Sequence, residues 1–353
     1  MSHSAPKPPA DGFVSDSPET FFDAVLVVSF GGPESMDEVM PFLEHVTRGR
    51  GVPRERLEEV VHHYALFAGT SPINDLNRAL VDALRVELAA HGVDLPVYLG
   101  NREWHPFLHE TLHEMAEDGV RRSLAFFTSA YASYSGCRQY LEGLEEARRE
   151  VGPRAPEVLN TRMFYNHPGW IEANADHLRR ALLELPPKRR AAAHVAFTAH
   201  SIPVAMARSC RYEEQLLECC SLVAAAVEVE DTALAFQSRS GSPRTPWLEP
   251  DILDHLRRVR ERGVEDVVVA PVGFVSDHME VLYDLDVEAR ELADELGLGF
   301  ARAATASTHP AFVAMIRELV QERLSLDVPR RASGRYPPDD DVCASDCCLP
   351  GTG

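Results

Sequence analysis

The sequence predicts an α/β protein made of two similar, doubly wound units of parallel sheet. Short apolar segments rich in β-branched residues alternate with longer segments of helical spacing along most of the chain. Alternation of this kind produces a parallel sheet that helices cover on both faces. A weak internal repeat supports the duplication, because Gly119 and Gly263 each end a helix shortly before an apolar strand. Two such units place a cleft between the carboxyl ends of their strands.

The first half of the chain contains four expected strands. They are apolar runs at residues 24–30, 95–100, 123–128 and 158–164. Helical spacing of apolar residues predicts helices over residues 36–46, 54–67, 74–91, 107–117, 138–151 and 170–185. Residues 1–20 are rich in Pro, Ser and Asp, and we expect them to be disordered.

The second half repeats the pattern. Its expected strands are residues 194–200, 234–237, 267–272 and 300–303, and its expected helices are residues 213–229, 249–261, an acidic segment containing 280–288, and 310–324. We therefore expect a first domain at 21–190, with inserted helices at 36–67, and a second domain at 191–309. A C-terminal helix at 310–326 packs back on the body, and residues 327–353 form a linker and a tail that contains cysteines.

Composition restricts the partners of the chain. The formal net charge of −20 disfavours binding to nucleic acids or to anionic membrane surfaces. No apolar run approaches about 18 residues, and the N-terminus lacks a charged start followed by an apolar core, so we expect a cytoplasmic protein without membrane insertion. Seven cysteines in a reducing compartment favour metal or thiol chemistry over disulfides.

An acidic segment follows the strand expected at 267–272. Glu280, Asp284 and Glu288 are four residues apart and would share one face of a helix, where like charges repel. Such oxygen ligands suit a divalent cation. A solvated acidic face of an acidic protein explains the pattern equally well.

His200 ends the strand expected at 194–200. A lone histidine at a strand end is more often structural than functional. However, the strand ends of one unit face the same cleft, so His200 and Glu280 could lie opposite each other. A neutral imidazole beside carboxylates accepts a proton or binds a borderline metal ion. The pair therefore indicates metal handling with proton transfer, and leaves the substrate open.

Seven segments, in this order, give the chain a resemblance to a known family. They are SFGGPES (29–35), HVTRGRG (45–51), HYALFAGTSPIN (63–74), TSAYASYSGCRQY (128–140), FTAHSIP (197–203), FQSRSGSPRTPWLEPD (236–251) and PVGFVSDHMEVLYDLDVEA (271–289). Over about residues 22–325 the chain resembles ferrochelatases, best the form of high-GC Gram-positive bacteria. The resemblance implies two Rossmann-like domains of the class II chelatase type with a porphyrin cleft. It also implies insertion of Fe(II) into coproporphyrin III, which yields coproheme and two protons in haem biosynthesis.

The resemblance implies roles for the polar residues of the site. His200 would be the base or iron ligand, and Glu280 its partner across the porphyrin ring. Asp284 and Glu288 would form a carboxylate path that collects Fe(II) or carries protons outward. Carboxylate oxygens bind Fe(II) less tightly than thiolates, which suits a metal ion that must be passed on.

The same resemblance implies porphyrin contacts in the first half. Coproporphyrin carries carboxylates, for which Arg is a suitable anchor. Arg48 is the best candidate of the basic stretch Arg48, Arg50, Arg54 and Arg56, most of which are expected to be solvated. Tyr64, Ser71 and Tyr140 match family positions that contact porphyrin, Ser133 is a weaker candidate, and Phe30 is expected in the wall. Some family members have a metal-ligating Tyr at the position of Phe30, and Phe cannot fill that role.

The cysteines of the tail indicate a second metal centre. Cys343, Cys347 and Cys348 lie within six residues of a polar segment, where they have no packing role. Many ferrochelatases hold a [2Fe–2S] cluster with three C-terminal cysteines and one internal cysteine, and by motif the internal one is Cys137. Cys210 is the reserve candidate. Spacing alone leaves zinc open, and Cys219 and Cys220 suit the core of an amphipathic helix.

Three alternative functions remain beside insertion of Fe(II) into coproporphyrin III. The first is a ferrochelatase for protoporphyrin IX. The second is a chelatase for another tetrapyrrole, such as cobalt insertion into sirohydrochlorin. The third is a non-catalytic module that binds haem or an iron–sulfur cluster and does not need Glu280. For the ferrochelatase interpretation we expect coproporphyrin III and Fe(II) as small-molecule substrates, and a monomer.

Overall fold

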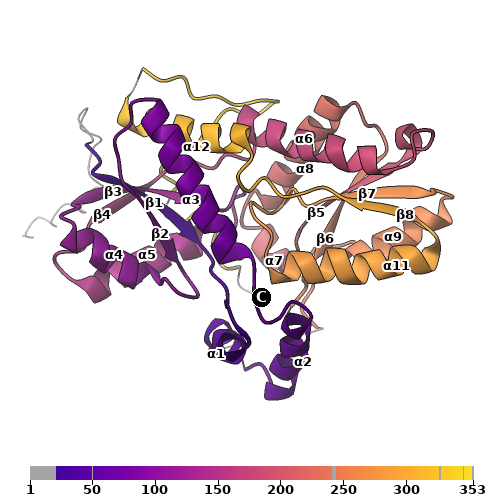
Figure 1. Ribbon diagram of the computed structural model, residues 1–353, viewed down its shortest axis with the longest axis horizontal. Coiled ribbons are helices and arrows are strands. Elements are labelled where there is room, and N and C mark those ends of the chain that lie inside the picture. The colour runs from indigo at the N-terminus through magenta and orange to yellow at the C-terminus, as the bar shows by residue number, and fades with distance from the viewer. Residues whose placement is uncertain (1–20, 50, 241–243, 326, 345, 352–353) are drawn as a thin grey trace, which may run out of the picture.

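The protein is described here by a computed structural model that covers residues 21–49, 51–240, 244–325, 327–344 and 346–351. The expected disorder of residues 1–20 lies outside the described residues, as does Arg50. The described chain forms two sheets side by side (Figure 1).

Each sheet has four parallel strands in the same relative order. The first sheet has the order β2-β1-β3-β4 and the second has β6-β5-β7-β8. The strands are β1 (Ala24–Ser29), β2 (Val97–Asn101), β3 (Arg122–Phe127), β4 (Glu157–Asn160), β5 (His194–His200), β6 (Thr232–Gln237), β7 (Asp266–Ala270) and β8 (Gly299–Arg302). The two-unit parallel fold predicted from the sequence is thus confirmed. The central strands β1 and β7 are buried along their whole length and mostly apolar, as is typical of strands covered on both faces.

Helices cover both faces of each sheet. The described α-helices are α1 (Met36–Val46), α2 (Arg54–Ala65), α3 (Ile73–Ala90), α4 (Leu108–Glu117), α5 (Gln139–Val151), α6 (Pro168–Glu184), α7 (Val204–Ala207), α8 (Tyr212–Val227), α9 (Ile252–Glu261), α10 (Met279–Val281), α11 (Arg290–Leu296) and α12 (Pro310–Leu324). A short 3-10 helix, η2 (Arg190–Ala192), precedes β5, and a five-residue π-helix, η1 (Tyr134–Arg138), precedes α5. The sequence pattern located all the longer helices but not α7.

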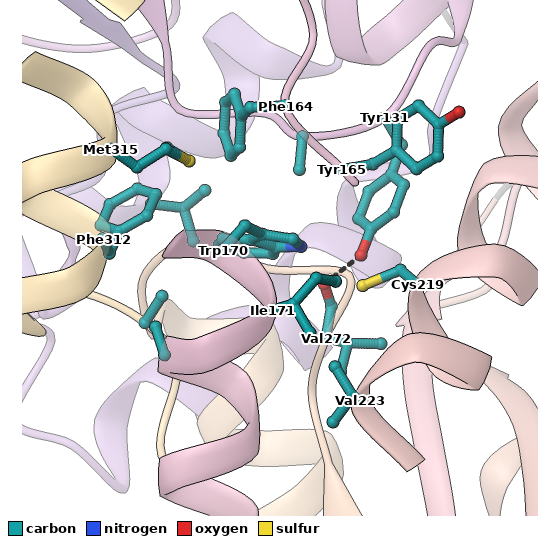
Figure 2. Close-up of a cluster of buried hydrophobic side chains, with 14 of the residues drawn as sticks. Tyr131, Phe164, Tyr165, Trp170, Ile171, Cys219, Val223, Val272, Phe312 and Met315 are labelled. Carbon is teal, nitrogen blue, oxygen red and sulfur yellow. Dashed lines mark hydrogen bonds between the residues drawn. The ribbon is translucent and has the colours of Figure 1, made fainter. Parts of the chain in front are cut away.

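Two helices join the halves. Helix α6 follows the first sheet in the chain but packs on α8, β7 and β8 of the second, whereas α12, the last helix, packs on α3 and α6 (Figure 1). Figure 2 shows the result at Trp170 of α6, which lies between Phe312 of α12 and residues of α8. Nearby, the Tyr131 hydroxyl donates a hydrogen bond of 2.8 Å to the carbonyl oxygen of Val272, which ties the loop after β3 to the loop after β7.

The inserted helices α1 and α2 project from the body on the side of the strand ends (Figure 1). Their apolar faces bury Phe42, Leu57 and Tyr64 in a small cluster of their own, together with Trp104. Met279, which precedes Glu280, packs in the same cluster. The insertion therefore reaches from the first unit to the acidic segment of the second.

The acidic segment is not the simple α-helix that four-residue spacing predicts. The short α10 continues into a π-helix, η3 (Leu282–Ala289), before α11. A π-helix has i→i+5 hydrogen bonds, and such insertions are frequent at functional sites. The strand expected at 158–164 is also shorter and ends at Asn160.

The C-terminal segment after α12 runs along both halves. On the first half, Asn166 Nδ2 donates to the carbonyl oxygen of Tyr336 at 3.0 Å. On the second half, Asp339 accepts from Gln215 Nε2 of α8 at 2.9 Å, and Arg335 pairs with Glu218. The segment expected as a linker is therefore packed against the body. None of the described helices combines the length and the apolar character that crossing a membrane requires.

Candidate active site

The ends of β5 and of the loop after β7 bring His200 and Glu280 together. His200 is the last residue of β5, and Glu280 lies in α10. His200 Nε2 lies 3.5 Å from Glu280 Oε2, and the two side chains keep 34% and 53% of their surface exposed. The other ring nitrogen, Nδ1, contacts the carbonyl oxygen of Ser201 at 2.5 Å. The imidazole is thus fixed at one nitrogen and presents the other to a carboxylate that solvent can reach.

The two groups shift the pKa of each other in opposite directions. Burial lowers the pKa of His200, but the hydrogen bond and charge of Glu280 outweigh burial, so the pKa is raised overall. Burial raises the pKa of Glu280, and the contact with His200 outweighs it, so that this pKa is lowered. The pair therefore stabilises a protonated imidazole beside an ionised carboxylate, as is required of a base that must take up a proton.

Asp284 meets the end of the neighbouring strand β6. Its Oδ2 accepts hydrogen bonds from Ser238 Oγ at 2.5 Å and from Gln237 Nε2 at 3.2 Å. Ser238 has a left-handed backbone with φ of 60°, an uncommon conformation for a residue with a side chain. Burial, with the charges of Glu280 and Glu288, raises the pKa of Asp284 to about 7.

Glu288 is the last of the three carboxylates in the chain and lies near the end of the π-helix. Burial and the charge of Asp251 raise its pKa. Because the charges of both Glu280 and Glu288 act on Asp284, the three carboxylates form an electrostatic series through the π-helix. Glu280 lies in α10 and the other two carboxylates lie in the π-helix, so the three are not on the single α-helix that their spacing predicts.

Aromatic rings connect the His200–Glu280 pair to the first unit. The Phe30 ring, directly after β1, lies 6.4 Å from that of Phe42, which in turn lies 6.4 Å from the Tyr64 ring. Burial, followed by the charge of Glu280, raises the pKa of Tyr64. Tyr64 is thus close enough to Glu280 to sense its charge, and α2 forms a wall beside the site. On the same helix, the His63 imidazole stacks on Tyr283 of the π-helix.

The other porphyrin-contact candidates lie in different surroundings. Ser71 is buried and packs closely against Gly32. A Cβ atom added to Gly32 would lie only 2.9 Å from the Cβ atom of Ser71. Ser133 is also buried, and its Oγ accepts from the backbone N–H of Gly136, where it caps η1. Tyr140 is buried against Phe127. Arg48 is exposed and lies 3.5 Å from His45.

Two further arginines of the basic stretch, Arg54 and Arg56, pair with acids. Arg54 contacts Glu44 and Glu58, and Arg56 contacts Glu59. Exposed pairs of this kind contribute little to stability. They are a solvated charged face, as expected from the sequence.

One arginine that the sequence pattern did not single out lies among these rings. Arg102 directly follows β2, and its guanidinium carbon lies 5.3 Å from the Phe30 ring and 5.2 Å from the Tyr140 ring. The short polar segment NREWHP reads as a turn, so no local signal distinguishes Arg102. Gln237 and Ser238 also lie at the site, and the sequence pattern around them is equally typical of a structural loop.

The tail cysteines gather around Cys137. The sulfur atoms of Cys347 and Cys348 are 3.3 Å apart. A hydrogen bond with Cys348 lowers the pKa of Cys137, and Cys347 contributes, after burial, to a raised pKa of Cys343 of about 12. Cys210, the reserve candidate, is near enough to Cys137 and Cys347 for their charges to raise its pKa, although burial is the larger cause. In contrast, Cys219 and Cys220 lie in the core, as expected.

Two surface cavities lie away from His200. One of about 340 Å³ is lined by Glu34, Glu38, Asn74, Arg78, Trp104, His105, Pro106 and Glu110. The other, of about 410 Å³, lies between α8 and β6. Among the described residues, no three His, Cys, Asp or Glu side chains are arranged to hold a metal ion. The porphyrin cleft between the two units stays a prediction.

Comparison with solved structures identifies the class of fold. SirB from Bacillus subtilis, solved with Fe3+, has a TM-score of 0.53 and 11% sequence identity over 87% of this chain and all of that one. DR2241 from Deinococcus radiodurans, described as similar to chelatases, has a TM-score of 0.50 and 15% identity over 85% of this chain and 54% of that one. The two parallel units thus have the chelatase fold.

Sequence comparison identifies the family. The family profile described as Ferrochelatase matches residues 22–324. The "Ferrochelatase" of Rhodopirellula baltica is 54% identical over 93% of both chains. The "Coproporphyrin III ferrochelatase" of Nocardia farcinica is 52% identical over 93% of this chain and 97% of that one, and its namesake from Streptomyces coelicolor is 50% identical over 93% of both. The chain belongs to the ferrochelatase family, a family of lyases, which confirms the resemblance.

Proposed function

We propose that this chain inserts Fe(II) into coproporphyrin III in haem biosynthesis and releases coproheme and two protons. The observation that carries the proposal is the His200–Glu280 pair at the strand ends of a ferrochelatase. The names of the relatives from Nocardia farcinica and Streptomyces coelicolor support the choice of porphyrin.

His200 is the proton acceptor in this proposal. Metal insertion requires that the porphyrin lose two pyrrole N–H protons, so a base must lie near the ring. Because Glu280 raises the pKa of His200, the imidazole takes up a proton readily, and the carboxylate stabilises the resulting charge. His200 and Glu280 also offer the nitrogen and oxygen ligands that would hold substrate Fe(II) before it enters the ring.

Asp284 and Glu288 form the path between this pair and solvent. With a pKa of about 7, Asp284 is partly protonated near neutral pH and can both accept and release a proton. Its hydrogen bonds from Ser238 and Gln237 fix the carboxylate in place. Glu288 continues the series outward, and the same oxygens would guide incoming Fe(II).

The porphyrin would lie against the rings of the first unit. Phe30, Tyr64 and Tyr140 supply apolar and aromatic surface, with Ser71 as a hydroxyl contact and Arg48 as an anchor at the rim. Ser133 is the weakest member of the set because its hydroxyl already caps η1. The domain limits at residues 190 and 309 also stay proposals.

We further propose a [2Fe–2S] cluster on Cys137, Cys343, Cys347 and Cys348. The chemistry of the donors supports the proposal, since thiols from the tail approach a buried internal thiol and four thiolates would complete the ligand shell. The described thiols are not arranged around a metal ion, so binding of the cluster would have to draw them together. When bound, the cluster would supply one-electron redox chemistry and would attach the tail to the body. Zinc remains the rival for the same thiols. A cytoplasmic monomer completes the proposal.

The decisive experiment is anaerobic Fe(II) insertion with coproporphyrin III and protoporphyrin IX in parallel. The absorption spectrum of the protein is recorded before substrate is added. Rapid turnover of coproporphyrin III with little turnover of protoporphyrin IX is the expected result. Preference for protoporphyrin IX would keep the enzyme activity but overturn the choice of coproporphyrin III as substrate. Absence of turnover, with cluster bands present in the spectrum, would favour a non-catalytic binding module.

A further inference from the structure

A buried cation lies on the porphyrin side of the first unit. The guanidinium of Arg102 lies between the rings of Phe30 and Tyr140, at 5.3 Å and 5.2 Å from their centroids. The Arg102 side chain keeps only 10% of its surface exposed. Arg102 follows β2 just as Phe30 follows the adjacent β1, so both belong to the strand-end edge of the sheet. The cation is therefore part of the wall that we assign to the porphyrin.

The hydrogen-bonding capacity of this guanidinium is only partly used. One terminal nitrogen pairs with Glu103 Oε1 at 3.1 Å. The Nε atom of Arg102 is buried and has no hydrogen-bond partner. A buried donor without a partner costs free energy, and a charged donor costs more than a neutral one. A carboxylate that reached Arg102 would satisfy this donor and would form a charge-assisted hydrogen bond.

The two candidate porphyrins present carboxylates differently. Protoporphyrin IX has two propionates on adjacent pyrrole rings, and both can face solvent from one edge of the macrocycle. Coproporphyrin III has a propionate on every pyrrole ring. Whichever edge faces solvent, at least one of its carboxylates points into the protein. An inward-pointing carboxylate without a cationic partner would be strongly disfavoured.

We propose that Arg102 binds an inward-pointing propionate of coproporphyrin III and thereby favours this porphyrin over one with two carboxylates. The inference rests on the proposed function and assigns the specificity of the same site to one residue. Arg48 does not fill this role, because it is exposed in the turn between α1 and α2 and could serve only a carboxylate at the rim. The faces of Phe30 and Tyr140 also attract the Arg102 guanidinium, which helps to hold it in position without a rigid ion pair.

The test compares Arg102→Met with the unchanged protein on both porphyrins. Loss of one charge-assisted contact raises the KM for coproporphyrin III about tenfold or more, with a smaller change in kcat. The KM for protoporphyrin IX changes less than about threefold, so the preference for coproporphyrin III falls. Arg102→Lys keeps the charge and recovers part of the preference. Arg180→Met, which removes an exposed arginine of α6, is the matched control and leaves both values unchanged.

Binding of metal-free coproporphyrin III, followed by quenching of porphyrin fluorescence, separates the two proposals. If the unchanged protein does not insert iron but binds coproporphyrin III more tightly than Arg102→Met does, the proposed function fails and the role of Arg102 stands. If Arg102→Met loses affinity equally for both porphyrins, or for neither, the role of Arg102 is overturned while the proposal of iron insertion stands. If Arg102→Met unfolds at a lower temperature, Arg102→Lys is compared with Arg102→Gln instead. The assignment is overturned if Arg102→Lys shows no greater preference for coproporphyrin III over protoporphyrin IX than Arg102→Gln does.

Discussion

The imidazole of His63 stacks on the phenol ring of Tyr283, with ring centroids 3.7 Å apart and planes inclined by only 7°. His63 belongs to the inserted helix α2 and Tyr283 to the π-helix, so the contact joins the two units beside Glu280. Burial lowers the pKa of His63, and Arg56 lowers it further. A planar substrate that enters between α2 and the π-helix must pass this contact.

The first prediction concerns this ring pair. Tyr283→Ala uncovers the imidazole, so the pKa of His63 rises toward its ordinary value. Tyr283→Phe keeps the stack and leaves the pKa of His63 low. Proton NMR of the imidazole signals as a function of pH measures both variants. An unchanged pKa in Tyr283→Ala would show that other neighbours bury His63.

The second prediction concerns the candidate base and its partner. His200→Ala and Glu280→Gln each reduce the rate of Fe(II) insertion at least about a hundredfold, the low end of what one general base supplies. His113→Ala, at an exposed position of α4, serves as the control. The assay is anaerobic turnover of coproporphyrin III. Near-normal rates in both site variants would refute the assignment.

The third prediction follows from the pKa of Asp284. The folded protein keeps a proton on Asp284 up to about pH 7, whereas the unfolded chain loses it near the model-compound value of 3.8. Between these values the folded state binds more protons, so the contribution of Asp284 to the free energy of unfolding decreases as pH rises. Asp284→Asn removes this decrease and keeps a hydrogen-bond acceptor for Ser238.

The stability of Asp284→Asn relative to the unchanged protein should therefore increase with pH. The expected gain between pH 4 and pH 8 is roughly 2–4 kcal/mol, from the linkage between pKa and stability. Urea unfolding at several pH values measures it. A difference between the two proteins that does not change with pH would show that Asp284 ionises normally.

The fourth prediction separates the candidate ligands of the cluster. Cys343→Ser and Cys137→Ser abolish the visible absorption of anaerobically purified protein, because a [2Fe–2S] cluster requires all four thiolates. Cys210→Ser keeps the absorption. Loss of the bands in Cys210→Ser and their survival in Cys137→Ser would make Cys210 the internal ligand. Metal analysis distinguishes iron from zinc.

The fifth prediction concerns the ion pair that fixes α12. Arg162 and Glu322 form two hydrogen bonds of 2.7 and 2.9 Å, and their side chains are 0% and 2% exposed. Arg162→Met leaves the carboxylate buried without its main partner and lowers the free energy of unfolding by about 3–5 kcal/mol. The double variant with Glu322→Leu recovers most of the loss. Denaturant unfolding tests both, and full stability of the single variant would contradict the reasoning.

The sequence was sufficient for features that depend on local pattern. Strand composition locates His200 at the end of β5, and regular spacing groups Glu280, Asp284 and Glu288. It did not indicate the π-helix, because carboxylates at this spacing suit an α-helix equally well. It also missed Arg102, since its environment comes from Phe30 and Tyr140, which are distant in the chain. Non-local contacts of this kind leave no periodic signal.

The C-terminal segment that contacts both halves also determines when the protein can be completed. Both sheets and α6 can form while the ribosome is still translating, since domains generally fold as the chain emerges. The contacts of Asp339 with α8 and of Tyr336 with Asn166 need residues that are translated after both sheets and α12. This segment can therefore connect the two halves only after both sheets have been translated.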